Sequence, residues 1–373
     1  EGGLDAGRRA IAALRLKEGG LAFGGFRQRA AAAYLGSWAL TLSSVAGCLP
    51  ASSWQAFRAR CPALAATLDA AESRLRDDGG ATLRGPDWVG FLARAQPKQQ
   101  AAWSRCLQAR IRAGLLERLS EDDRVDFRSH GGKGAGGFLQ PPLLFEGDKP
   151  ASIPDKHFTV SLRDRLLLPV CPEGARCRHR DRNDVLCNEL IDRRGKHALK
   201  CEVGPFRGVR HDSLRDFTAR FHRLVTGYAA PTEQRVPAWD RVNPRTGRLE
   251  EAVLDVATRD AVHGGPIFVD ATVTCAHSGY APCQRARAGK DGLAASNAVD
   301  DKRARYPPSG GELVPLAFEA GGRPADTTLA FVRGWGAASE GAERSGVIRY
   351  AWQQLSLLLQ SGNAELILSA IGG

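Results

Sequence analysis

The sequence predicts an α+β fold, in which a helical N-terminal region precedes a small mixed β-sheet flanked by helices. Apolar residues recur at helical spacing before residue 130, as in Trp103, Leu107 and Ile111. Short apolar runs typical of strands appear only after residue 230, and amphipathic segments precede, interrupt and follow them. Such an order indicates one sheet covered by helices.

Each element has its own signal in the chain. A helix is expected over residues 156–168 because Pro169 ends it, and a second follows from the spacing of Leu214, Phe217 and Phe221. A third helix carries Lys302, and a last one begins near Ile348. The predicted strands cover residues 234–237, 252–256, 267–274 and 313–318.

Breaker residues divide the chain into five segments. Gly132-Lys133-Gly134 lies in one breaker, but no Ser or Thr follows the lysine and no strand precedes it, so a phosphate-binding loop is rejected. The expected segments are a helical region (1–130), a Gly/Pro connector with a short helix (131–170), a Cys/His segment (171–203), a core with the sheet (204–340) and a C-terminal helix (341–373).

Composition narrows the classes of partner. The formal charge is +11 over 373 residues, which favours a polyanion. No apolar run is long enough for a membrane span, and the N-terminus has no signal-peptide pattern. The nine cysteines include scattered ones, which favours a reducing, intracellular site over a disulfide framework. The sequence contains no Met, so it is interpreted as part of a longer polypeptide.

A Cys/His cluster predicts a zinc knuckle. Cys187, His197 and Cys201 offer thiolate and imidazole ligands, which suit tetrahedral Zn²⁺. Cys177 is the first choice for the fourth ligand, with Cys171 and His179 as alternatives. Buried thiols beside a surface histidine would be the simpler explanation. The cluster overlaps a run of cations that we expect to bind nucleic acid, among them Arg178, Arg180, Arg193, Arg194, Lys196 and Arg210.

Two acids at predicted strands indicate a second metal site. Asp255 and Asp270 each follow an apolar run, where an ionised acid needs a partner or a cation. Together they could hold Mg²⁺, which would stabilise phosphoryl charge and activate water. Pairing of both acids with arginines is the competing explanation. The supporting candidates are Lys302 with Tyr306 four residues later, Lys290 as the alternative lysine, and Glu233 or Glu251 as a third acid.

Residues 171–325 resemble the C-terminal part of non-LTR retrotransposon polyproteins of the dinoflagellate type. These carry a zinc knuckle followed by a restriction-like endonuclease of the PD-(D/E)xK superfamily. The resemblance is carried by Cys187, His197 and Cys201, then Arg210-His211, Leu254-Asp255-Val256, Val269-Asp270-Ala271, and Lys302 with Tyr306. Leu254 stands where that motif has proline, and the second acid is not followed by the usual lysine two positions on.

The resemblance implies a magnesium-dependent enzyme that nicks target DNA to prime reverse transcription in the nucleus. It implies that Asp255 and Asp270 are the motif acids, that Lys302 replaces the strand lysine, and that His211 belongs to a basic-histidine motif. The implied partners are DNA, element RNA and an upstream polymerase domain of the same polyprotein. The alternative is an inactive zinc-knuckle remnant that binds nucleic acid through phosphate contacts.

Overall fold

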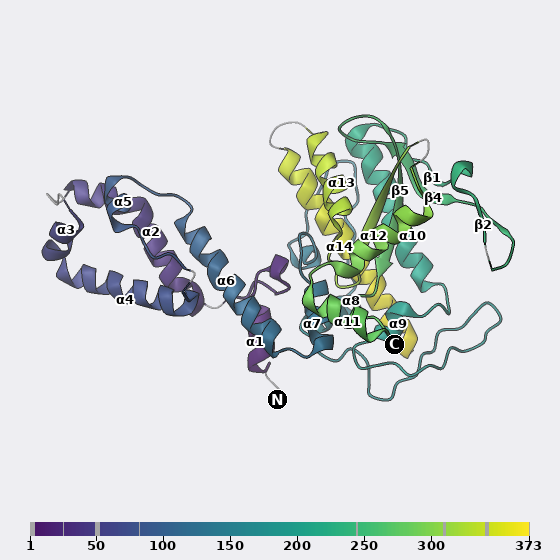
Figure 1. The fold of residues 1–373 in the computed structure, drawn as a ribbon, viewed down its shortest axis with the longest axis horizontal. Coiled ribbons are helices and arrows are strands. Elements are labelled where there is room, and N and C mark those ends of the chain that lie inside the picture. Colours follow the sequence, from purple (N-terminus) through teal and green to yellow (C-terminus); the bar gives the residue numbers. More distant parts are fainter. Residues whose placement is uncertain are drawn as a thin grey trace. The chain divides into compact units, whose positions relative to one another are not determined.

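The computed structural model describes residues 4–24, 26–48, 53–81, 83–243, 245–308, 311–339 and 343–372. It divides the chain into two compact units, each of which is described by itself (Figure 1). The first comprises Glu1–Arg15 with Ala22–Arg118, and the second comprises Leu16–Leu21 with Leu119–Gly373. The unit boundary therefore lies about one helix before the position near residue 130 that the sequence indicates.

The first unit is helical, as predicted. Its core is apolar and includes Leu35, Leu42, Phe57 and Trp103, which are all buried. Trp54 stacks on Trp88 with ring centroids 4.6 Å apart. The helices are α1 (Ala6–Ala13), α2 (Phe26–Cys48), α3 (Trp54–Arg60), α4 (Pro62–Gly79), α5 (Trp88–Ala93) and α6 (Gln99–Arg118).

The second unit combines helices with a sheet, so the α+β prediction is confirmed. Its helices are α7 (Glu121–Ser129), α8 (Asp155–Arg165), α9 (Lys196–Lys200), α10 (Phe206–Thr226), α11 (Ala281–Gly289), α12 (Leu293–Arg305), α13 (Asp326–Ala337) and α14 (Glu343–Ile371). Its strands are β1 (Thr232–Arg235), β2 (Arg241–Val242), β3 (Leu249–Glu250), β4 (Val253–Arg259), β5 (Pro266–Thr274) and β6 (Glu312–Glu319).

Four of these strands form one mixed sheet in the order β1-β4-β5-β6. The β1–β4 and β4–β5 pairs are antiparallel, whereas β5 and β6 are parallel. Helices α10, α13 and α14 pack Phe217, Trp335 and Tyr350 into a shared core with Val269 of β5. Helix α12 packs on the sheet as well, where its Val299 belongs to a separate cluster with Ala317 of β6. The sheet is therefore covered by helices, as Figure 1 shows.

Several elements differ from the predicted ones. Strand β1 ends at Arg235, because Pro237 has no N–H for the ladder and begins a 3₁₀ turn (Pro237–Trp239). Helix α13 was not predicted, because Gly334 and Gly336 flank Trp335 and weaken the helical pattern. The β2–β3 hairpin was not predicted either, because its strands have only two residues each. Helix α14 packs against α8, α10 and α13, so it belongs to the core of the second unit.

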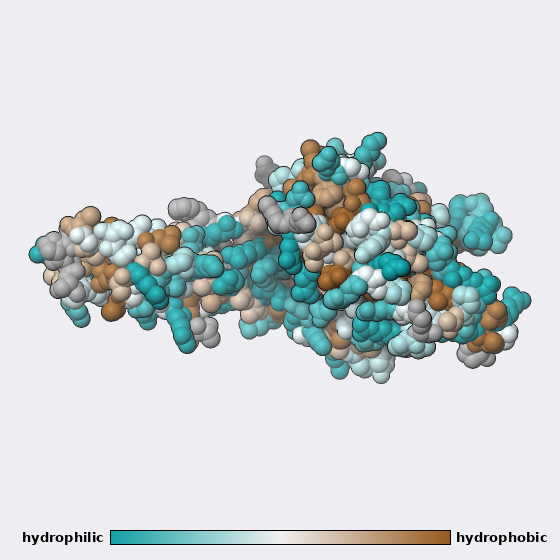
Figure 2. Space-filling model, turned by 90° about the horizontal axis from the view of Figure 1, so that it is seen from above, coloured by the Kyte–Doolittle hydropathy of each residue, from teal (hydrophilic) through white to brown (hydrophobic). Residues whose placement is uncertain are grey.

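The exterior agrees with the basic, polar composition. Hydrophilic residues are interspersed with smaller groups of apolar residues on the face drawn in Figure 2. Among the described residues, no helix has the length and apolar character needed to cross a membrane.

Candidate functional site

A hairpin and a short helix assemble the Cys/His group. Backbone hydrogen bonds join Cys177 N to Glu189 O at 2.8 Å and Cys187 N to His179 O at 2.8 Å. These bonds bring Cys177 and Cys187 onto one hairpin. Gly195 then adopts a left-handed conformation (φ +68°) before α9, the helix that carries His197 and has Cys201 as its C-cap.

The four ligand atoms have the spacing that a tetrahedral ion requires. Cys201 Sγ lies 3.8 Å from Cys177 Sγ and 3.7 Å from Cys187 Sγ, and Cys187 Sγ lies 3.4 Å from His197 Nε2. Zinc–sulfur and zinc–nitrogen bonds of about 2.3 and 2.0 Å would separate the ligands by about 3.8 and 3.5 Å. All four atoms lie within 4.8 Å of one another. The donor set therefore fits a Zn²⁺-sized cation.

The structure also separates the alternatives for the fourth ligand. Cys177 belongs to the group, whereas Cys171 does not. His179 Nε2 lies 2.9 Å from Ser369 Oγ, so a hydroxyl of α14 holds that ring. Burial raises the pKa of the Cys177 thiol to about 12. A cation would reverse this shift by favouring the thiolate, which is the form that binds metal.

Two cations expected to contact nucleic acid are instead buried in an internal network. Arg194 lies 3.2 Å from Asp126 and 3.3 Å from Asp164, and Lys196 pairs with both acids. The side chains of Arg194 and Lys196 are only 16% and 15% exposed. We name this network the buried ionic cluster, and it comprises Asp126, His130, Asp164, Arg194, Lys196 and His277.

The buried ionic cluster joins the knuckle to three other segments of the second unit. Asp126 comes from α7, Asp164 from α8, and His277 from the loop after β5. Burial raises the pKa of Asp126. The neighbouring Lys196, His277 and Arg194 nevertheless hold this pKa below its usual value. Asp126 and Asp164 were not predicted as functional or structural partners from the sequence. The only signal for Asp126 is its position between Val125 and Phe127, which are both buried.

Arg210 is a further correction to the expected nucleic-acid contacts. Its side chain is buried, its Nη1 donates to Asn363 Oδ1 at 2.7 Å, and burial lowers its pKa to about 10. It therefore fixes α10 to α14. In contrast, Arg178, Arg180 and Arg193 are exposed and stay available to a partner.

The second group lies where β4 and β5 meet. Val256 pairs with Val269 and Ala257 with Phe268, so one further step of this register places Asp255 opposite Asp270. Both acids are buried, with exposed fractions of 9% and 4%. Asp255 Oδ2 accepts a hydrogen bond of 2.6 Å from the backbone N–H of Ala271. Strand pairing therefore brings the two carboxylates onto the same part of the sheet.

Helix α10 adds a histidine to these acids. His211 Nε2 lies 3.0 Å from Asp255 Oδ2, and ligand atoms of His211, Asp255 and Asp270 all lie within 4.8 Å of one another. The hydrogen bond with Asp255 raises the pKa of His211. Two carboxylates and an imidazole are donors that a divalent cation accepts.

Lys302 reaches the acids from α12. Its Nζ lies 2.7 Å from Asp270 Oδ2, although no described group makes a hydrogen bond of good geometry to this oxygen. Burial nevertheless raises the pKa of Asp270, and the charge of Asp255 adds to the shift. A bound cation would counteract this shift by favouring the ionised carboxylates.

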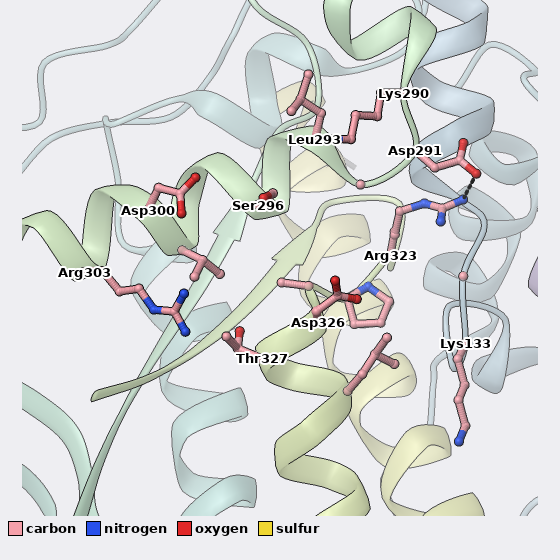
Figure 3. A pocket seen from close by; sticks show the side chains of 16 residues that line it. Lys133, Lys290, Asp291, Leu293, Ser296, Asp300, Arg303, Arg323, Asp326 and Thr327 are labelled. Atoms are coloured by element: carbon pink, nitrogen blue, oxygen red, sulfur yellow. Dashed lines mark ion pairs between the residues drawn. The ribbon is translucent and has the colours of Figure 1, made fainter. Parts of the chain in front are cut away.

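Two of the expected supporting residues lie elsewhere. Tyr306 follows the end of α12, and its buried ring packs beside Trp239 with centroids 5.5 Å apart. It belongs to an apolar cluster with Leu254, because the chain leaves helical geometry at Tyr306 and the residue no longer shares a face with Lys302. Lys290 lines a separate cavity of about 350 Å³ with Asp291 and other residues (Figure 3). Lys302 is therefore the lysine of the acidic group.

Neither candidate for a third acid joins the group. Glu233 is 65% exposed and pairs with Arg215 at 2.5 Å. Glu251 pairs with Arg235 at 2.8 Å. Both glutamates are therefore bound to arginines, and neither is among the residues that share the ligand spacing with Asp255.

Comparisons with known proteins add no identity to this picture. No family model matches the chain, and no curated protein matches it. A function for this chain has to be inferred from the two groups of side chains themselves.

Proposed function

We propose that the second unit is a metal-dependent DNA endonuclease. Asp255 and Asp270 would hold Mg²⁺, and the Cys/His group would hold a structural Zn²⁺. The observation that carries this proposal is the convergence of Asp255, Asp270 and His211 within 4.8 Å, with Lys302 at 2.7 Å from Asp270. Paired carboxylates with an adjacent lysine are suited to hydrolysis of a phosphodiester.

Each side chain has a role that its contacts support. When bound, magnesium supplies charge to the phosphoryl oxygens and lowers the pKa of a bound water. Lys302 extends its ammonium group to the acids, where it can bind a phosphate oxygen or orient water. His211 holds Asp255 through its 3.0 Å contact, or serves as a third ligand itself. The N–H of Ala271 fixes the other side of Asp255.

Other features support the wider context of the proposal. A four-stranded mixed sheet with helices on it agrees with the restriction-like fold that the resemblance implies. The nine cysteines lie within the described residues, and none of them forms a disulfide. The proposal includes a reducing compartment, the nucleus. On this proposal the chain belongs to a retrotransposon polyprotein and acts on target DNA, together with element RNA and an upstream polymerase domain.

The test is nicking of supercoiled plasmid DNA. We expect the parent protein to nick in added Mg²⁺, and Asp270→Asn to lose this activity while remaining folded by circular dichroism. Asp300→Asn is the matched control, because Asp300 is an exposed acid on α12 that lies outside the acidic group and lines a separate cavity. Equal nicking by the parent and Asp270→Asn would refute the proposal.

A second candidate is a nucleic-acid-binding module without catalysis. The ion pair between Lys302 and Asp270 favours it, because this lysine can neutralise the acid without any metal. This candidate predicts DNA binding that survives Asp255→Asn and Asp270→Asn, with no nicking by any form of the protein. Nicking by the parent alone would exclude it.

A further inference from the structure

A groove in the second unit runs from the knuckle to the acidic group. It consists of two cavities of about 620 and 410 Å³. The larger is lined at one side by the knuckle residues Leu199 and Lys200, and the smaller by His211. The cavities are continuous because they share Glu202, Arg207, Thr272, Val273 and Lys302.

Strand β5 leads from the acidic group into this groove. Side chains alternate between the faces of a strand, so Thr272 and Thr274 share the face of Asp270. Both threonines line the larger cavity. The four steps of strand from Asp270 to Thr274 extend about 13 Å at about 3.3 Å per residue. The groove thus has a floor with hydroxyl groups, and His211 and Lys302 at its end contact Asp255 and Asp270.

Cations line the walls of the groove. The knuckle and the start of α10 contribute Lys200 and Arg207, while α11 and α12 contribute Arg287 and Arg305. Lys302 is the fifth cation of the larger cavity, and the buried Arg210 lines the smaller one. The lining carboxylates are those of Glu202 and Asp301. Lys200 and Arg305 are exposed, so their charges face solvent. The excess of cations suits a ligand with a row of negative charges.

We propose that this groove binds the phosphate backbone of one DNA strand and guides it to Asp270. The choice of DNA rests on the proposed endonuclease function. Lysine, arginine and threonine side chains are common partners of phosphates, and such contacts position the strand without reading its bases. Phosphates of one strand advance about 3.4 Å per nucleotide along the axis of B-form DNA, so the floor equals the axial rise of about four nucleotides.

Two double variants with the same chemistry test the groove. Lys200→Gln with Arg305→Gln removes two exposed groove cations. Lys290→Gln with Arg303→Gln removes two exposed cations from the separate cavity in Figure 3. Arg303 and Arg305 lie on the same helix, α12. Each pair therefore loses one lysine and one arginine, and the net charge falls equally.

The readout is fluorescence anisotropy of a labelled DNA duplex over a range of salt concentrations. No Mg²⁺ is added, so the DNA is not cleaved. A chelator, which would also remove zinc, is therefore not needed. Each phosphate contact contributes about 0.9 to the slope of log K against log salt, so the groove variant should lose about 1.8 from the slope. The control variant should keep the parent slope.

Three results would overturn the proposal. The first is a parent-like slope for the groove variant. The second is an equal loss in both variants, which would indicate only general charge. The third comes from an RNA duplex as a second probe, because a loss of slope confined to RNA would overturn the assignment to DNA. The endonuclease proposal fails separately, because a groove-dependent slope without any nicking would refute catalysis and leave the groove intact.

Discussion

Replacement of Lys196 by methionine should destabilise the protein without weakening its binding to DNA. Lys196 pairs with Asp126 and Asp164, whose side chains are 5% and 13% exposed. Methionine keeps much of the length of the side chain but removes the ammonium group. Both acids would then stay buried with less compensating positive charge. Their remaining partners would be Arg194 and the two histidines of the buried ionic cluster.

The magnitude follows from the burial and the remaining partners. Removal of one partner from a buried ion pair costs about 3–5 kcal/mol, and we expect about 3 kcal/mol because Arg194 still contacts both acids. For a unit of this size, each kcal/mol lowers Tm by about 2–4 °C, so the expected decrease is about 6–12 °C.

Lys200 provides the matched comparison on the same short helix. It is exposed and lines the groove, so Lys200→Met should change the free energy of unfolding by less than about 0.5 kcal/mol. It should reduce the salt slope of DNA binding by about 0.9, whereas Lys196→Met should leave that slope unchanged. Thermal unfolding and anisotropy titrations measure the two effects separately. A stable Lys196→Met protein with a reduced salt slope would show that Lys196 contacts DNA and would refute the buried network.

Three further outcomes are expected. Cys201→Ser should lose the bound zinc, measured by atomic absorption, while Cys171→Ser should retain it because Cys171 lies outside the ligand group. The free energy of unfolding should fall by about 3 kcal/mol between pH 6.5 and 4 through His222, and His222→Gln should remove this part of the fall in denaturant titrations. Burial lowers the pKa of His222 from 6.5 to about 4, so the unfolded chain takes up the proton first. Tyr306→Phe should leave plasmid nicking unchanged, because the ring packs against Trp239 away from Lys302.

Each of these outcomes has a clear opposite. Zinc retained by Cys201→Ser, or lost from Cys171→Ser, would contradict the assigned ligands. An unchanged pH dependence in His222→Gln would show that this histidine is not the buried neutral base that accepts from Trp335 Nε1 at 3.0 Å. A loss of nicking in Tyr306→Phe with normal stability would place the hydroxyl at the reaction after all.

Local patterns in the sequence predicted the elements that depend on local physics. The strand expected over residues 267–274 is β5 (Pro266–Thr274), because alternating apolar residues specify a strand with one buried face. The helix with Lys302 and the long C-terminal helix were predicted for similar reasons. Cys177 was the favoured fourth ligand, and it is the cysteine that the hairpin brings to the group.

The same local patterns do not predict ion pairs between residues that are far apart in the sequence. Arg194 and Lys196 lie in a run of cations that is typical of a solvated surface. In the structure, however, they form ion pairs with acids 30 to 71 residues earlier in the chain. Nothing local distinguishes them from Arg193, which stays exposed. Tyr306 was placed on the face of Lys302 by helical spacing, which fails because the helix ends at Arg305.

The position of α14 has a consequence for the order in which the chain can fold during synthesis. Phe138 N donates to Ser356 Oγ, and Arg178 N to Ala370 O, so both the early connector and the knuckle depend on this late helix. The first unit has a core of its own and can form as soon as it leaves the ribosome. The sheet and knuckle must wait for residues 343–371, so the proposed nuclease stays inactive until that segment has emerged. Contacts across about 200 residues also make this step intrinsically slow.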